Sequence, residues 1–415
     1  MNGAYRPLER CRVGGSTDLI PVLQLGDQEL TGVFPRSDEL VPSGPLDLVW
    51  CPDSGLLQLG HTYDAGEMYG DNYGYRSGLN AHMARHLTEK IAYLERLIEL
   101  RPGDSVLDIG SNDATSLKAY TTPDLVRIGI DPTGAKFRAY YPDDIRLVPD
   151  FFSAENYRSV NDRPARIVTS IAMFYDLDDP IAFARDVASV LAPDGVWHFE
   201  QSYLPAMLRT TGYDTICHEH LEYYSLSVVK RILDAAGMKL VDVQMNDANG
   251  GSFAVTAALG GSATRANTAA IDWFLDQEER MGLHTLAPFR AFEERVFRHR
   301  QDLTRLLRDL AADGRRVMGY GASTKGNVTL QFCGITEADL TAVAEVNPEK
   351  YGRVTPGTRI PIISEAEARA ANPDYFLVLP WHLKTAILQR ESAFRERGGR
   401  FIFPFPEIEI IGPEV

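Results

Sequence analysis

The stretch Val106-Leu107-Asp108-Ile109-Gly110-Ser111-Asn112-Asp113 decides the fold of this chain. Its first half is typical of a buried strand, and Gly110 then permits a tight turn and a close approach of the backbone to a ligand. A second apolar run ends in Asp131, at the spacing from Gly110 at which a carboxylate meets ribose hydroxyls. The stretch therefore predicts the first strand, turn and helix of an α/β unit, with a cofactor site at the turn.

The turn lacks the second glycine of a dinucleotide-binding motif, because Asn112 stands where G-x-G-x-x-G requires glycine. Such a turn need not admit a pyrophosphate, which favours a nucleoside cofactor without a diphosphate, namely S-adenosylmethionine. The alternative for this turn is a generic connection from a strand to a helix. Phe152 is predicted to lie beside the adenine of the cofactor, and its alternative is a place in the hydrophobic core. The predicted cofactor-binding residues are Asp108, Gly110, Asn112, Asp131, Phe152 and Met173.

Strand and helix signals alternate along most of the chain, which predicts mostly parallel sheets covered by helices on both faces. We therefore predict an α/β fold in three parts: a small N-terminal β-rich module (1–70), an α/β unit (71–262), and a helical connector with a second α/β unit (263–415). The predicted strands are 105–109, 127–131, 166–171, 195–200, 239–243, 252–258, 316–319, 340–345, 375–379 and 400–403. The predicted helices are 80–100, 116–120, 182–191, 228–236, most of 263–312, the segment after 325, and 383–390.

Composition narrows the class of protein. The 415 residues carry a formal charge of −15, which argues against a nucleic-acid-binding surface, while 44% hydrophobic and 24% charged residues are ordinary for a globular protein. No apolar run is long enough to span a membrane, and the N-terminus has no signal-peptide character. Scattered cysteines fit a reducing cytoplasm, the predicted location, rather than a disulfide framework. They are Cys11, Cys51, Cys217 and Cys333.

Two of the nine histidines lie in the run Cys217-His218-Glu219-His220. Imidazoles titrate near neutrality and are the usual side chains for moving protons at physiological pH. The alternative is a polar loop without a chemical role. A proton-transfer cluster downstream of a cofactor turn nevertheless outlines an enzyme.

A glycine-rich segment, residues 319–326, follows a predicted strand and places Lys325 near the start of a helix. A helix N-terminus with a lysine is suited to an anion such as a diphosphate. The segment is not a P-loop, because Thr324 rather than glycine precedes the lysine. Lys350 and residues 356–358 are predicted at neighbouring strand ends, and the alternative for Lys350 is a solvated surface lysine.

Six motifs follow one another along the chain: residues 108–113, 218–220, 250–252, 319–326, 356–358 and 379–382. In this order the chain resembles, over essentially its whole length, the sugar C-methyltransferases that act on nucleotide-linked 4-keto-deoxy sugars. The resemblance implies a small N-terminal zinc module, a class I S-adenosylmethionine-dependent methyltransferase domain, and a C-terminal Rossmann-like domain. It also implies that the nucleotide-sugar substrate lies between the last two.

The implied reaction is methyl transfer to C3 of the sugar, beside a C4 ketone. A C–H beside a ketone is acidic enough for a positioned base to remove, and the enolate carbon then attacks the methyl group. We predict His220 as the base, Glu219 as a residue that either orients a group or binds a sugar hydroxyl, and Tyr75 as a donor to the ketone oxygen. The predicted substrate contacts are Tyr73, Asp176, His218, Tyr224, Asn249, Gly321, Lys325 and Lys350. Packing is the alternative for Tyr224, and an ordered loop for the tyrosines at 73 and 75.

The chain departs from the family in its N-terminal module. Residues 11–14 and 51–54 each keep one cysteine, Cys11 and Cys51, where the family carries C-x-x-C. Two thiolates do not make a four-ligand structural zinc site, so we predict no zinc and a module held by its apolar strands. Near the histidine run, Cys217 and Asp176 stand where relatives often carry tyrosine and histidine, and we predict Cys217 to be a small buried apolar residue.

Two alternatives to this reading of the sequence remain. One is O-methylation of a nucleotide sugar, in which His220 deprotonates a hydroxyl group. The other is a non-catalytic protein that binds sugar nucleotides. The residues do not specify the sugar, the nucleobase or the oligomeric state.

Overall fold

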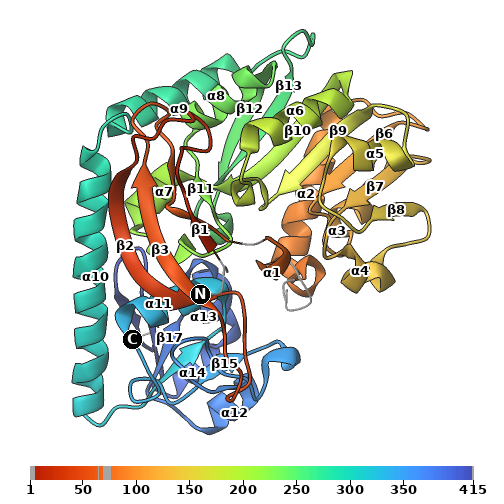
Figure 1. Ribbon diagram of the computed structural model, residues 1–415. Helices are drawn as coiled ribbons and strands as arrows, with labels where there is room; N and C mark the ends of the chain where they lie inside the picture. The colour runs from red at the N-terminus through yellow and green to blue at the C-terminus, as the bar shows by residue number, and fades with distance from the viewer. Residues whose placement is uncertain (1–4, 64, 69–75, 414–415) are drawn as a thin grey trace.

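The computed structural model describes residues 5–63, 65–68 and 76–413 and is shown in Figure 1. The N-terminal module pairs β1 (Tyr5–Pro7) with β5 (His61–Tyr63) and forms a second sheet in the order β11-β4-β3-β2. The strands of this sheet are β2 (Ile20–Glu29), β3 (Ser43–Trp50), β4 (Leu57–Leu59) and, from the central part of the chain, β11 (Glu222–Tyr223). The strand β11 directly follows His218–His220, so the module is hydrogen-bonded to the segment that carries the predicted base.

The central unit is built on a seven-stranded sheet in the order β12-β13-β10-β9-β6-β7-β8. Its strands are β6 (Ser105–Ile109), β7 (Val126–Ile130), β8 (Ile145–Val148), β9 (Ala165–Ile171), β10 (Leu191–Ser202), β12 (Met238–Asn246) and β13 (Ser252–Leu259). The strand β6 pairs in parallel with β7 and β9, whereas β13 is antiparallel to both of its neighbours. The parallel strands therefore end at one edge of the sheet, where the cofactor turn and residues 172–176 lie.

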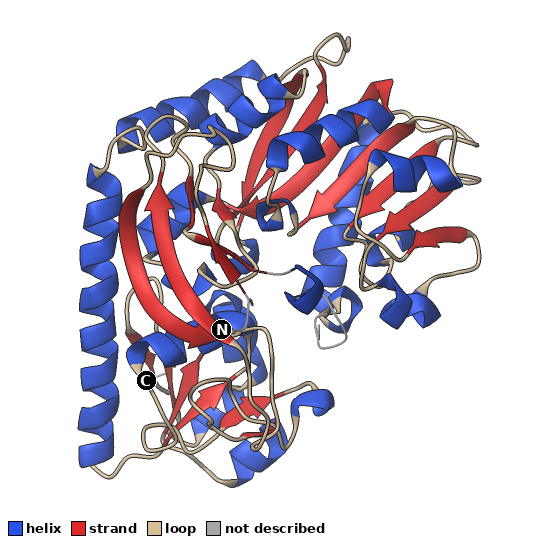
Figure 2. Ribbon diagram, viewed as in Figure 1, coloured by secondary structure: helices blue, strands red, loops and turns tan. Residues whose placement is uncertain are grey.

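Helices cover both faces of this sheet, as Figure 2 shows. They are α2 (Ala81–Leu97), α3 (Thr115–Lys118), α4 (Gly134–Phe137), α5 (Ala154–Val160), α6 (Pro180–Val190) and α8 (Leu226–Ala235), while α7 (Leu204–Thr210) follows β10 and packs mainly in a different core. Val106 packs with Ile91 and Leu94 of α2, while Leu107 packs in the core on the opposite face. Burial on both faces explains why β6 reads as an almost uninterrupted apolar run.

The C-terminal unit follows two helices, α9 (Thr268–Met281) and the 26-residue α10 (Ala287–Ala312). Its sheet has the order β16-β15-β14-β17-β18-β19. Its strands are β14 (Val317–Tyr320), β15 (Val343–Glu345), β16 (Ile362–Ser364), β17 (Tyr375–Val378), β18 (Arg400–Phe403) and β19 (Glu409–Ile411). Its helices are α11 (Thr324–Cys333), α12 (Glu365–Ala370), α13 (Lys384–Arg390) and α14 (Ser392–Glu396), while the short α1 (Ala65–Met68) lies after the N-terminal module.

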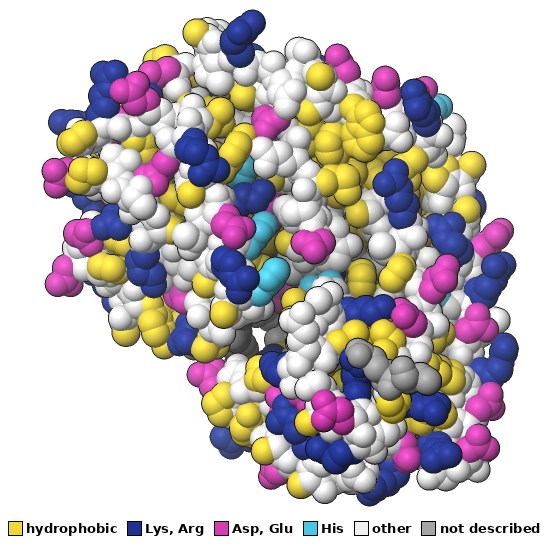
Figure 3. Space-filling model, turned by 180° about the vertical axis from the view of Figure 1, so that it is seen from behind, with side chains coloured by type: hydrophobic (Ala, Val, Ile, Leu, Met, Phe, Trp, Pro, Cys, Tyr) yellow, Lys and Arg dark blue, Asp and Glu magenta, His cyan; other side chains and the backbone are white. Residues whose placement is uncertain are grey.

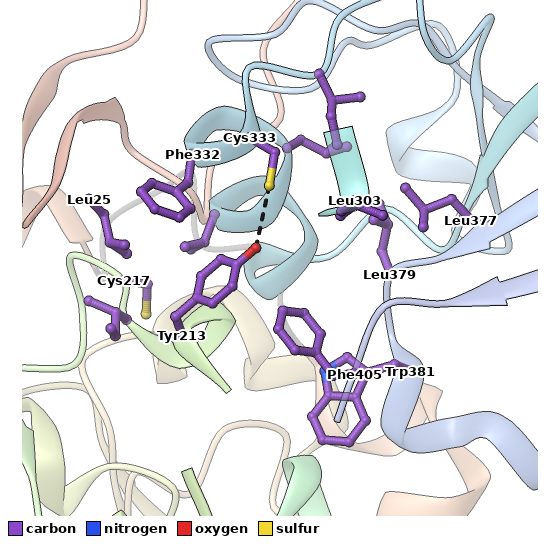
Figure 4. Close-up of a cluster of buried hydrophobic side chains, with 14 of the residues drawn as sticks. Leu25, Tyr213, Cys217, Leu303, Phe332, Cys333, Leu377, Leu379, Trp381 and Phe405 are labelled. Carbon is purple, nitrogen blue, oxygen red and sulfur yellow. Dashed lines mark hydrogen bonds between the residues drawn. The ribbon is translucent and has the colours of Figure 1, made fainter. Parts of the chain in front are cut away.

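The N-terminal module, α10 and the C-terminal sheet share one apolar core. Leu46, Leu48 and Trp50 alternate along β3 and are buried, and the Trp50 ring lies 5.6 Å from Phe289 of α10. Figure 4 shows another part of this core, where the Tyr213 hydroxyl lies 3.4 Å from Cys333 Sγ. The segment that precedes His220 is therefore packed against the C-terminal unit as well as the module.

The predicted fold class is confirmed: the central unit is a Rossmann-like α/β unit, followed by a second one and preceded by a β-rich module. The edge strands β8, β16 and β19 and the helices α4, α5, α7, α12 and α14 have no counterpart in the sequence prediction. Each is short, and β8 buries only Ile145, so their periodicity is too weak to recognise. No helix in the described ranges is both long and apolar enough to cross a membrane.

Candidate active site

The cofactor turn has the backbone that its glycine predicts. Gly110 has a φ of 74° and Asn112 a φ of 49°, both in the left-handed region that favours glycine and asparagine. A Cβ atom at position 110 would lie 3.2 Å from Met173 Cγ. The predicted cofactor residues Gly110 and Met173 therefore lie against each other, and a side chain at position 110 would force Met173 to move.

The two acids predicted at the cofactor site differ in environment. Asp131 accepts hydrogen bonds from the Asn112 amide at 2.7 Å and the Thr133 amide at 2.6 Å, so it joins the end of β7 to the turn. Asp108 is buried beneath the turn, where the Thr169 hydroxyl donates to it at 2.5 Å. Burial raises the pKa of Asp108 to about 7, because the ionised carboxylate loses its hydration and lies near the charge of Asp131.

Phe152 packs at the edge of the core, whereas the segment after residue 75 contacts the cofactor turn. The Phe152 ring packs edge-on against Phe183 at 5.2 Å and is partly buried. The amide of Ser77 donates to the Asn112 side chain at 3.0 Å, and the amide of Gly78 to the Asp113 carboxylate at 3.0 Å. The segment that follows the predicted Tyr73 and Tyr75 is thus fixed on the cofactor turn, although both tyrosines lie outside the described residues.

His220 has the tautomer that a base requires. Its Nδ1 lies 2.8 Å from the carbonyl oxygen of Thr215. A carbonyl only accepts, so Nδ1 carries the hydrogen and Nε2 keeps a basic lone pair. The ring lies against Tyr175, with the ring centroids 4.2 Å apart. Burial, and then the positive charge of Lys325, lower the pKa of His220 to about 4, so the imidazole is neutral at pH 7.

Glu219 lies beside the base with few polar neighbours. The Cys217 thiol approaches its carboxylate at 3.9 Å. Burial raises the pKa of Glu219 to about 7, because little compensates the lost hydration of the charged form. Asp176 is close enough to Cys217 that its charge, after burial and Glu219, helps to raise the thiol pKa. The backbone joins the two segments, since the Leu221 amide donates to the Tyr175 carbonyl at 2.8 Å.

Two predicted substrate contacts lie away from His220. The His218 ring is buried against the module, edge-on to Tyr63 at 4.8 Å and with Nε2 3.4 Å from the Gly44 carbonyl. Tyr224 is fully buried and stacks on Phe174 at 5.3 Å, inside the core of the central unit. Packing, the alternative weighed for Tyr224, describes its observed surroundings.

The C-terminal unit carries the predicted substrate residues Gly321, Lys325 and Lys350, and Lys325 contacts the predicted residue Asn249 of the central unit. The Lys325 ammonium donates to the main-chain carbonyl of Asn249, and Ser323 caps α11 by accepting from the Gly326 amide at 3.0 Å. Gly321 has a φ of 83° and packs against Pro380. Lys350 donates to the Ala322 carbonyl at 2.7 Å, so it lies at the same end of the sheet rather than on the open surface.

Sequence reasoning assigned no role to Trp381, His382 or Asp214, which join the two units. The indole N–H of Trp381 donates to Asp214 at 2.7 Å, and the same ring lies where Gly250 would otherwise carry a Cβ atom. Burial, with the charges of Lys325 and His82, lowers the pKa of the neighbouring His382 to about 3. The only signal was the quoted motif 379–382, which has no chemistry until the fold supplies its partners. Figure 3 shows histidines gathered with basic and acidic side chains around a hollow between the two lobes.

The turns 11–14 and 51–54 lie next to each other, as the two halves of a structural zinc site do. Their side chains do not provide the four ligands that such a site requires. Cys11 Sγ lies 3.1 Å from the Ser54 hydroxyl, and a Cβ atom on Gly14 would lie 3.3 Å from that of Ser54. Within the described ranges, no group of three or more histidine, cysteine or acidic side chains could hold a metal ion. A tetrahedral structural zinc site needs four protein ligands, and this pair of turns offers two thiols.

Three protein families match consecutive parts of the chain. Residues 11–69 match the family described as "Putative zinc binding domain", residues 79–243 a methyltransferase domain, and residues 247–406 the C-methyltransferase C-terminal domain. The chain is also 32% identical to the C-methyltransferase NovU of Streptomyces niveus, over 100% of this chain and 99% of that protein.

Solved structures resemble the chain only in part. A S-adenosylmethionine-dependent methyltransferase from Clostridium acetobutylicum is 15% identical, over 43% of this chain and 91% of that chain, with a TM-score of 0.31. The plantazolicin methyltransferase BpumL in complex with SAH is 12% identical, over 42% of this chain and 84% of that chain, with a TM-score of 0.34. Both structures therefore resemble less than half of this chain.

Proposed function

Since the chain belongs to the family of S-adenosylmethionine-dependent C-methyltransferases, we propose that it methylates C3 of a nucleotide-linked 4-keto-deoxy sugar. The observation that carries this proposal is the neutral His220, whose Nδ1 hydrogen is held by the Thr215 carbonyl and whose Nε2 is left basic. A weakly acidic C–H beside a ketone requires such a base, and its conjugate acid must form in a partly buried site.

The cofactor would be held at the turn after β6. The left-handed backbone at Gly110 opens the turn to a ligand, and Asp131 marks the strand end at which a ribose is bound in this fold. When bound, S-adenosylmethionine supplies an electrophilic methyl group on sulfur. We propose Asp108, Asn112, Phe152 and Met173 as the further residues that shape this end of the site.

The proposed base step balances as follows. His220 Nε2 takes the proton from C3, and the electron pair of the C–H bond forms the C3–C4 double bond of an enolate while the C4 oxygen becomes negative. Bound S-adenosylmethionine would supply the methyl group that the enolate carbon accepts, S-adenosylhomocysteine would be the leaving group, and the C4 ketone would be restored. His220 afterwards releases its proton to solvent. Glu219, beside the base, would bind a sugar hydroxyl, and Tyr75 would donate to the C4 oxygen.

The substrate anion would be held by the C-terminal unit. The capped N-terminus of α11 and the Lys325 ammonium form a positive end of the site, and Lys350 lies behind Ala322 at the same edge. Lys325 is close enough to His220 to lower the pKa of the imidazole. An anion at Lys325 therefore lies near the base, as a diphosphate on C1 of the reacting sugar requires.

The remaining parts of the proposal concern the chain as a whole. We propose the division into 1–70, 71–262 and 263–415 that the sequence predicts, with Tyr73, Asp176, Asn249 and Gly321 as substrate contacts. All four cysteines are buried free thiols, which supports a reducing compartment, the cytoplasm, as its location.

The test is a screen of dTDP-, GDP-, CDP- and UDP-linked 4-keto sugars with S-adenosylmethionine, followed by mass spectrometry and NMR. We expect one substrate to gain one methyl group, attached to C3. A methyl group on oxygen would establish O-methylation instead, and binding of a sugar nucleotide without any turnover would identify a non-catalytic binding protein.

A further inference from the structure

The connection between β2 and β3, residues 30–42, leaves the N-terminal module and lies along the C-terminal unit. We call it the module loop. Its base is closed by a hydrogen bond from the Leu30 amide to the Pro42 carbonyl at 2.9 Å. Four hydrogen bonds hold it on the C-terminal unit. The Asn327 side-chain amide donates to the Thr31 carbonyl at 2.8 Å and the Arg353 guanidinium to the Phe34 carbonyl at 2.8 Å. The Val354 amide donates to the Pro35 carbonyl at 2.9 Å and the Arg359 guanidinium to the Glu39 carbonyl at 3.0 Å.

Gly32 of the module loop lies against the predicted catalytic segment. A Cβ atom at this position would collide with Glu219 Oε1 and would lie 3.3 Å from Glu219 Cδ. Gly32 does not have the left-handed φ that would itself require glycine. Position 32 therefore requires glycine because the Glu219 carboxyl group occupies the space of a side chain, and not because of the backbone conformation of the loop.

Phe34, two residues further along, lies against the predicted anion site. The Lys350 ammonium lies 4.0 Å from the centre of the Phe34 ring, within the range of a cation–π interaction. The same ammonium donates to the Ala322 carbonyl and lies 3.8 Å from Glu345. One short segment of the module thus contacts both the group beside the base and a lysine at the anion end.

Resting on the proposed function, we propose that the module loop is a wall of the substrate site, in which Gly32 is a positioning residue for Glu219 and Phe34 orders Lys350 for the substrate diphosphate. The N-terminal module then contributes to catalysis through residues 32–34, whether or not it binds a metal. Gly32 acts through Glu219, since the loop has no side chain there to touch the substrate.

A double-mutant cycle tests the role of Gly32. Gly32→Ala should displace the Glu219 carboxyl group and lower kcat/KM about 100-fold, the scale of loss for a displacement of about 1 Å. In the Glu219→Ala background the same Gly32→Ala substitution should change kcat/KM less than about threefold, because the group it displaces is gone. Equal effects in both backgrounds would overturn the proposal, since they would show that Gly32 acts on the fold alone.

A matched control lies in the same module. Gly60 also lacks a left-handed φ, and a Cβ atom there would meet its nearest neighbours at 3.5 Å, an ordinary contact. Gly60→Ala should leave kcat/KM and the melting temperature unchanged. Phe34→Leu should raise KM for the sugar nucleotide and leave the affinity for S-adenosylmethionine unchanged, and an unchanged KM would overturn the role of Phe34.

A binding readout separates this inference from the proposed function. The same cycle is repeated by calorimetry, with the sugar nucleotides of the screen titrated into protein saturated with S-adenosylhomocysteine. If the affinity losses in the Gly32→Ala and Glu219→Ala cycle are non-additive but the wild-type protein transfers no methyl group, C-methylation of these sugars is refuted. The role of the module loop as a wall of the substrate site is then supported. Methyl transfer by the wild-type protein with additive effects would support the function and refute the wall, and no binding and no turnover would refute both.

Discussion

At the scale of single residues, the two histidines of the run 217–220 lie in different environments. His218 is buried against the module, while His220 faces the segment 175–176 and the Lys325 charge. The hydrogen bond from Nδ1 to the Thr215 carbonyl fixes the His220 tautomer. Of the two histidines, the structure therefore supports His220 as the base.

Removing the base should abolish most of the methyl transfer. His220→Asn keeps a polar side chain of similar size but cannot accept a proton, so kcat should fall about a thousandfold, within the range for general bases. Steady-state kinetics measures the loss, and calorimetry should show unchanged binding of S-adenosylmethionine. His284→Asn, a substitution of a more exposed surface histidine, is the control. Turnover near the wild-type rate in His220→Asn would exclude His220 as the base.

The pH dependence of the reaction follows from the lowered pKa of His220. The neutral imidazole is the active form, and a pKa of about 4 keeps it neutral down to about pH 5. The acid limb of kcat/KM should therefore lie well below the ordinary histidine pKa of about 6.5. A limb near pH 6.5 that is absent in His220→Asn would contradict the assigned environment.

The same shift predicts how stability changes with pH. The folded protein releases the His220 proton at a lower pH than the unfolded chain does, so the unfolded chain binds more protons between about pH 4 and pH 6.5. The free energy of unfolding should fall as the pH is lowered through this range. His220→Asn should reduce this dependence in chemical denaturation measured at several pH values, and an unchanged slope would contradict it.

At the scale of elements, a buried arginine joins the module to the central unit. The Arg12 guanidinium donates to the Leu59 carbonyl at 3.0 Å, the His61 carbonyl at 3.1 Å and the Thr62 hydroxyl at 2.8 Å. Its Nε lies 3.5 Å from the fully buried side chain of Glu222 in β11. The module was predicted to be held by apolar strands, and the structure adds this buried polar contact to them.

Arg12→Ala should destabilise the junction of the module with β11. It leaves the carbonyls of Leu59 and His61 without their donor, and each buried polar group left unsatisfied costs about 1–3 kcal/mol. Arg6→Ala is a matched control, since Arg6 pairs with the same Asp178 as Arg12 but is 62% exposed, and it should cost less than about 1 kcal/mol. Urea denaturation measures both, and equal effects would show that burial of Arg12 is unimportant.

The two facing turns of the module should bind no zinc. Gly14 and Ser54 supply no thiolate, and the Cys11 thiol lies 3.1 Å from the Ser54 hydroxyl. Protein purified from zinc-replete medium should contain far less than one zinc per chain, and its melting temperature should be unchanged by EDTA. One stoichiometric zinc, or a chelator-dependent fall in melting temperature, would show that other groups complete the site.

At the scale of the whole molecule, the sequence predicted the units better than the contacts between them. The strand–turn–helix at 106–113 and the alternation of elements depend on local periodicity, which a single sequence contains. The bond from Trp381 to Asp214, the insertion of the module loop beside Glu219 and the pairing of β11 with β4 join residues over 160 positions apart. Such contacts depend on shape complementarity between units, which no local pattern records.

The same distinction applies to the candidate site. Gly110, Asp131, His220 and Lys325 were recognisable because each belongs to a strand end, a helix start or a reactive run. His382 was not assigned a role, because its importance depends on the charges that the fold places around it. The fold brings the Lys325 charge of the C-terminal unit close enough to lower the pKa of His220 in the central unit.

The central claim is that His220 removes a proton from a sugar carbon, and hydrogen exchange tests it most directly. The 4-keto sugar nucleotide that the enzyme methylates is incubated in D₂O with enzyme and S-adenosylhomocysteine, and NMR follows the hydrogen on C3. We predict that deuterium enters at C3 with the wild-type protein and enters about a thousandfold more slowly with His220→Asn. Exchange at the same rate in both proteins, or methyl transfer by a wild-type protein that never exchanges this hydrogen, would contradict the account.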